Sequence, residues 1–169
     1  MLVRGTQGSG KTTLAAALGK RLGWPVVSRE AFRDAVQATL SADLEPRGPV
    51  ARRAVEDFHL ALTAAAGRDE SLIADSTSPS GVCEEDLSRL GQHADLMSIL
   101  CVVPREVAIG RCAARTGSGT LLAVLKARDE VLWARFEQPL QCDIPQLEVA
   151  TTDGYQPTLD DMIEWVVSG

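Results

Sequence analysis

Short apolar runs alternate along the chain with longer stretches in which apolar residues recur every three or four positions. The short runs predict buried strands of a parallel sheet, and the periodic stretches predict helices that cover it. The predicted strands are 1–4, 25–28, 71–75, 95–103 and 146–151. The predicted helices are 11–22, 29–41, 49–66, 83–92, 105–115, 127–136 and 158–167. We therefore expect an α/β fold, a three-layer α/β/α sandwich whose five parallel strands present ligand-binding residues at their carboxyl ends.

The loop after the first predicted strand carries the sequence GTQGSGKTT, residues 5–13. It matches the pattern G-x-x-x-x-G-K-[ST] in full, and a strand precedes it and a helix follows it, as that pattern requires. Glycines let successive backbone N–H groups converge on phosphate oxygens, beside the positive end of the following helix. An ordinary glycine turn is the alternative, but the strand–loop–helix order favours a nucleotide phosphate site, the P-loop.

This loop predicts a binding site for ATP and Mg²⁺. Lys11 is expected to reach the β- and γ-phosphates, and the Thr12 hydroxyl is expected to bind Mg²⁺. The residues expected to contact the nucleotide are Gly5, Gln7, Gly8, Ser9, Gly10, Lys11, Thr12 and Thr13.

Other sequence segments distinguish among classes of phosphate-loop protein. A guanine-reading N-K-x-D segment is absent from the sequence, which argues against a GTPase. Residues 87–92 resemble an ABC-type signature but lack its paired glycines, and they are better explained as a helix end. A small kinase, with donor and acceptor pockets in one domain, is the remaining class.

Composition limits the cellular setting and the kind of partner. The 169 residues predict a single domain, 1–169, and the net charge of −6 argues against a broad basic face for duplex DNA. There is no apolar run long enough to span a bilayer and no secretory signal pattern, so we expect a cytoplasmic protein without a membrane partner. The four cysteines, Cys83, Cys101, Cys112 and Cys142, are expected to be buried reduced thiols.

Polar residues that follow the second and third strands are candidates for the chemistry. Glu30 and Arg33 lie three residues apart and share one helical face, so Glu30 could accept the proton of an attacking hydroxyl while Arg33 binds an acceptor anion. Favourable placement of an acid in the first helical turn, with a surface ion pair, is the alternative. Asp75 ends the third strand, where it could serve the metal site by orienting Mg²⁺-bound water, could contact a substrate, or could cap the next turn.

Two arginines follow the fourth strand on one helical face. Arg111 and Arg115 lie four residues apart, and the sequence GSGT that comes next could act as a hinge. These features predict a small helical lid at approximately 111–128 that closes over the transferring phosphoryl group, with Arg111 or Arg115 placed to neutralise its charge. Solvated helix arginines are the alternative.

Taken together, these motifs resemble the polynucleotide kinase-like group of P-loop kinases, which includes phage 5'-hydroxyl kinase and bacterial RNA-repair kinase domains. REAFR, residues 29–33, is similar to the Arg-Asp-x-x-Arg segment of that group, and DSTS, residues 75–78, is similar to its D-x-T-N segment. The resemblance implies that Glu30 is the base and that Arg33 holds an acceptor phosphate. It also implies that Arg115 is the catalytic lid arginine, with its neighbour Arg111 on the nucleotide. It also implies ATP as phosphoryl donor.

These observations predict an ATP- and Mg²⁺-dependent phosphotransferase acting on a hydroxyl acceptor. A nucleic-acid 5'-hydroxyl or another nucleotide-borne hydroxyl is the first expectation, because of the REAFR and DSTS segments. The acidic net charge favours the alternative, a small-molecule kinase for a sugar, nucleoside or antibiotic. A nucleotide-binding regulatory ATPase without an acceptor is the alternative from another class.

Overall fold

The computed structural model describes residues 1–39, 49–114 and 129–168. Its strands are β1 (Leu2–Gly5), β2 (Val26–Ser28), β3 (Ile73–Ser76), β4 (Ser98–Val102) and β5 (Gln146–Ala150). Its helices are α1 (Lys11–Leu22), α2 (Arg29–Thr39), α3 (Pro49–Ala66), α4 (Glu84–Leu90), α5 (Arg105–Ala113), α7 (Glu130–Glu137) and α8 (Leu159–Ser168). Each predicted strand and helix has its counterpart. Across the described ranges, no helix combines the length and apolar character that crossing a bilayer requires.

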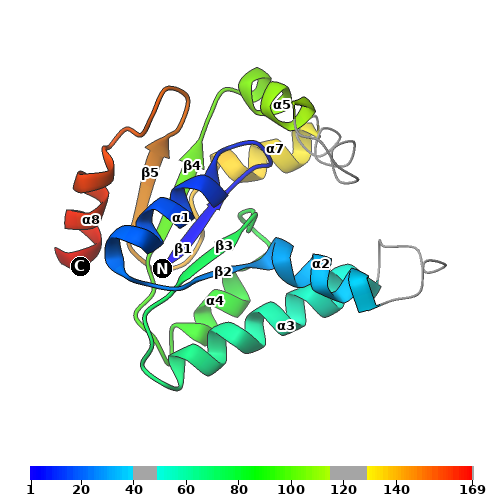
Figure 1. Cartoon of the computed structure of the whole chain (residues 1–169), viewed down its shortest axis with the longest axis vertical. Helices are drawn as coiled ribbons and strands as arrows, with labels where there is room; N and C mark the ends of the chain where they lie inside the picture. The colour runs from blue at the N-terminus through cyan, green and yellow to red at the C-terminus, as the bar shows by residue number, and fades with distance from the viewer. Residues whose placement is uncertain (40–48, 115–128, 169) are drawn as a thin grey trace.

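The five strands form one parallel sheet in the order β2-β3-β1-β4-β5. The phosphate-loop strand β1 is therefore central, between β3 and β4, and its carboxyl end lies beside theirs. Val3 of β1 is in register with Asp75 of β3 and with Ile99 of β4. Helices lie on both faces of the sheet (Figure 1), so the predicted three-layer α/β fold is confirmed.

Alternate residues of β1 enter two separate hydrophobic clusters. Val3 is fully buried with residues of α1 and α8, including Leu14, Leu18 and Met162. Leu2 points to the opposite face, where its cluster includes residues of α3 and α4. This period of two fixes which helix covers which face of the sheet, and it leaves the carboxyl ends of the strands for the site.

The cysteines match the prediction in part. All four thiols are free, but only Cys101 and Cys112 are buried, and Cys83 and Cys142 are partly exposed. Burial raises the pKa of the Cys101 thiol to about 12. Cys101 lies in central strand β4, whereas Cys83 and Cys142 precede α4 and β5, at the edge of the core, which explains the difference.

Candidate active site

The loop between β1 and α1 has the backbone geometry that its glycines predict. Gly8 and Gly10 adopt positive φ angles of 81° and 82°, a region that favours glycine. Gly10 directly precedes α1, so the first-turn N–H groups of that helix face the loop. A Cβ atom built on Gly8 would lie 2.4 Å from the backbone oxygen of Ala108 in α5. Backbone packing as well as φ therefore requires glycine at this position.

Replacing Gly8 with alanine should destabilise the fold and impair nucleotide binding. We expect a loss of about 2 kcal/mol or more, because the positive φ costs roughly 1–2 kcal/mol and overpacking roughly 1–3. Gly81 provides the matched control, since its φ is 78° and a Cβ atom added there would have no neighbour within 4 Å. Thermal denaturation of Gly8→Ala and Gly81→Ala separates the two costs. Equal losses in the two variants would show that contact with Ala108 has no energetic effect.

Two side chains from outside the loop brace it. Thr151, just after β5, donates from its Oγ1 to the backbone oxygen of Ser9 at 2.6 Å. Arg111, in the last turn of α5, donates to the backbone oxygens of Gly8 at 3.4 Å, Thr151 at 2.8 Å and Thr152 at 2.9 Å. The structure thus places Arg111 beside the loop, with its guanidinium bound to three carbonyls. The contact with nucleotide predicted for Arg111 stays a prediction. Sequence reasoning missed Thr151, because its partner lies far away along the chain.

Lys11 and the two threonines after it begin α1. Lys11 is buried and lines a cavity, whereas Thr12 and Thr13 are exposed at the mouth of the loop. Because other side chains leave Thr12 exposed, its hydroxyl would be accessible to a metal ion bound with the nucleotide.

Asp75 fits the role predicted for it beside Mg²⁺. It ends in the same cavity, is only 3% exposed, and its Oδ1 atom has no hydrogen-bond partner among the described residues. A buried carboxylate oxygen without a partner is costly, which a cation or its bound water would relieve. The described residues contain no cluster of three or more His, Cys, Asp or Glu side chains, and a magnesium ion that is held largely by phosphates and water does not need one. Bound there with the Thr12 hydroxyl, Mg²⁺ would neutralise phosphate charge.

The cavity has a volume of about 270 Å³ and joins the phosphate loop to the start of α2. Its lining residues come from four places: the loop, the β2–α2 junction, α3 and the end of β3. They are Gln7, Lys11, Ser28, Arg29, Glu30, Arg33, Ala54, Val55, Asp75, Ser76 and Thr77. The structure therefore brings the predicted residues Lys11, Glu30, Arg33 and Asp75 to one cavity.

Glu30 and Arg33 are paired at this cavity. Arg33 Nη2 lies 3.0 Å from Glu30 Oε1 and 2.9 Å from Asp34 Oδ1. The pKa of Arg33 is lowered by burial, but hydrogen bonds and charge from Asp34 and Glu30 outweigh this and raise it above its ordinary value. The side chain that the sequence predicted to hold an acceptor anion is thus already bound to two carboxylates.

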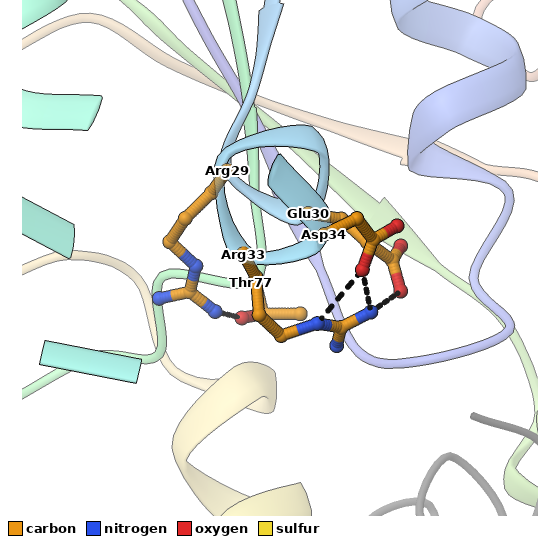
Figure 2. A network of polar contacts seen from close by, with 5 residues as sticks. All are labelled: Arg29, Glu30, Arg33, Asp34 and Thr77. Carbon is orange, nitrogen blue, oxygen red and sulfur yellow. Dashed lines mark hydrogen bonds and ion pairs between the residues drawn. The ribbon is translucent and has the colours of Figure 1, made fainter. Parts of the chain in front are cut away.

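Arg29 has different surroundings, although it lies only one helical turn before Arg33. Figure 2 shows its side chain directed toward Thr77, away from the Arg33 group. The pKa of Arg29 is lowered by burial and by the like charge of Arg33. No role for Arg29 was predicted from the sequence, because an arginine in a first helical turn has no signal that separates it from a solvated one.

Arg115 lies outside the described residues, as do residues 116–128 of the predicted lid. The lid and the catalytic role of Arg115 therefore stay predictions.

Family comparison connects this geometry to known proteins. The model of a family described as AAA domain, AAA_33, matches residues 1–139, which is most of the chain. The chain belongs to the AAA_33 family. The match includes the phosphate loop and every residue that lines the cavity, while Thr151 lies beyond it. No protein of curated function matches the chain.

Solved structures share the fold of this AAA_33 domain at low identity. A candidate kinase from Chloroflexus aurantiacus is 24% identical, with a TM-score of 0.73 over 99% of this chain and 93% of that one. Shikimate kinase from Aquifex aeolicus is 18% identical, with a TM-score of 0.56 over 99% and 95%. A chain of the Pnkp1/Rnl/Hen1 RNA repair complex is 22% identical, with a TM-score of 0.57 over 75% and 43%. These likenesses show that the chain shares the fold of shikimate kinase and of a chain of the RNA repair complex.

Proposed function

We propose that this protein transfers the γ-phosphate of ATP·Mg²⁺ to an alcohol held in the cavity. The observation that carries the proposal is the cavity itself, which is lined by both the phosphate-loop Lys11 and Glu30. A donor site and a basic group that share one small space suit direct transfer between two bound molecules. An ATPase that acts on water alone has no need of an acceptor space beside the phosphate loop.

The proposed roles follow the chemistry of phosphoryl transfer. Lys11 neutralises charge on the β- and γ-phosphates, with Thr12 and Asp75 at the magnesium ion. Glu30 orients and deprotonates the attacking hydroxyl. Arg33 holds the Glu30 carboxylate in place, and Arg115 of the predicted lid stabilises the transferring group.

A nucleotide-borne hydroxyl, such as the 5'-hydroxyl of a nucleic acid, is the first proposed acceptor. The segments REAFR and DSTS support it by their similarity to the polynucleotide kinase-like group, and both segments contribute residues to the cavity wall. Only the terminal nucleotide would need to enter the cavity, because that nucleotide carries the reacting 5'-hydroxyl.

A small-molecule acceptor is the second candidate, and the size of the cavity favours it. Its volume of about 270 Å³ lies just below the range for small-ligand pockets, roughly 300–1,000 Å³. The net charge of −6 also opposes a long polyanion more than a single small molecule.

Transfer of label from [γ-³²P]ATP to a panel of alcohols tests the proposal. The panel contains 5'-hydroxyl DNA and RNA, hydroxymethyl-base DNA, nucleosides, sugars and sugar acids. We expect Mg²⁺-dependent labelling of one acceptor class. If the protein hydrolyses ATP at a rate that no alcohol changes, and labels none of them, the protein is a regulatory ATPase and the kinase proposal is wrong.

A further inference from the structure

Arg29 and Arg33, one helical turn apart at the start of α2, differ in how their charge is balanced. Arg33 is bound to the carboxylates of Glu30 and Asp34. Arg29 forms one hydrogen bond, to the Thr77 hydroxyl, and no ion pair with any residue in the described ranges. The start of α2 therefore has one arginine in direct contact with two acids and one that contacts none of the described acids.

The charge of Arg29 lies against the cavity. Arg29 is partly buried, lines the cavity wall, and faces it beside the Thr77 hydroxyl at the end of β3. The charges of Glu30 and Asp75 act on Arg29 without direct contact and offset part of the desolvation cost of this partly buried cation. An anionic ligand in direct contact would offset more of it. A guanidinium suits this task, because its planar fork can donate two parallel hydrogen bonds to a phosphate or carboxylate.

We propose that Arg29, with the Thr77 hydroxyl, anchors an anionic group of the phosphate acceptor, and that Arg33 instead positions the Glu30 carboxylate. The inference rests on the proposed kinase function for its account of the acceptor. It replaces the sequence-based expectation that Arg33 binds the anion. The substrate class is an alcohol that also carries a phosphate or a carboxylate, which a terminal nucleotide or a sugar acid would supply.

Matched pairs of acceptors measure the anchor directly. Thymidine 3'-monophosphate is compared with thymidine, and gluconate with sorbitol, so that each pair differs in one anionic group. Transfer from ATP gives kcat and KM for each compound, and isothermal titration with a non-hydrolysable ATP analogue present gives binding without turnover. Arg29→Gln, Arg29→Lys and Arg33→Gln are compared with Arg89→Gln, which removes an exposed arginine of α4 outside the cavity.

The wild-type protein should favour the anionic member of at least one pair by about tenfold or more, the scale of a charged hydrogen bond. Arg29→Gln should abolish this preference by raising KM for the anionic compound, with KM for ATP unchanged. Arg29→Lys should restore part of it. Arg33→Gln should lower kcat for both members alike and keep the preference, and Arg89→Gln should behave as wild type. If the thymidine pair shows the preference, the acceptor is a nucleotide, and if the gluconate pair shows it, the acceptor is a sugar acid.

Failure of the anchor and failure of the kinase proposal give different results. Equal transfer to the charged and the neutral member of each pair overturns the anchor, while the kinase function stands. A preference for the anionic member that persists in Arg29→Gln has the same meaning. Binding of an anionic probe that depends on Arg29, without transfer to any alcohol, supports the anchor and overturns the kinase function. If neither anionic probe binds the wild-type protein, the anchor is wrong.

Discussion

Glu30→Gln is expected to lower phosphoryl transfer by at least about a hundredfold, the scale of general-base catalysis, while ATP affinity stays near wild type. The substitution preserves size and the ability to accept a hydrogen bond from Arg33, but it removes the basic oxygen that would take the proton of the alcohol. Glu30 is exposed at the cavity rather than in the core, so the fold should tolerate the change. Initial rates of label transfer at saturating ATP, together with nucleotide binding by titration, provide the measurement.

Asp34→Asn is the matched control for this prediction. Asp34 is the other carboxylate on the Arg33 guanidinium, at 2.9 Å against 3.0 Å for Glu30, but it does not line the cavity. We expect Asp34→Asn to keep most of the transfer rate, and Glu30→Asp to recover part of what Glu30→Gln loses. Equal losses in Asp34→Asn and Glu30→Gln would mean that Glu30 acts only through the ion pair, and not as the base.

Local sequence was sufficient to predict the sheet and the phosphate loop. Each strand is a short apolar run, and the loop glycines, Lys11 and Thr12 lie within one segment of nine residues. Their geometry depends on backbone conformation and on the start of α1, which the same segment determines. The position of Asp75 beside the loop was also predictable, because neighbouring parallel strands end at the same edge of the sheet.

Contacts between distant segments could not be predicted in the same way. The hydrogen-bonded residues Thr151 and Ser9 are 142 positions apart in the sequence, and Arg29 and Thr77 are 48 positions apart. The strand pattern indicates no role for Arg4, yet this residue is only 1% exposed. Its Nη2 donates to the backbone oxygen of Gln138 at 3.3 Å. Which of two neighbouring arginines is paired with acids depends on side-chain direction, and the spacing of residues in a helix does not determine that.

Lys11→Met is expected to reduce turnover by at least about a hundredfold and to weaken ATP binding as well. Lys11 is the first residue of α1, is only 6% exposed, and lines the cavity beside the predicted phosphate position. A preorganised charge in a site shielded from water stabilises developing charge far more than a solvated one does, and its loss typically costs about 10²–10³ in rate. Methionine has a similar length and no charge, so a buried position should accept it.

Lys20→Met, in the last turn of the same helix, controls for loss of a positive charge. Lys20 is exposed and lies at the opposite end of α1 from the loop, so transfer and ATP affinity should be unchanged. Thermal denaturation followed by circular dichroism should show both variants folded, and titration with a fluorescent ATP analogue compares their affinities. If Lys11→Met folds and keeps more than about a tenth of wild-type turnover, the phosphates are not held where the loop geometry indicates, because a charge acting there contributes more than tenfold.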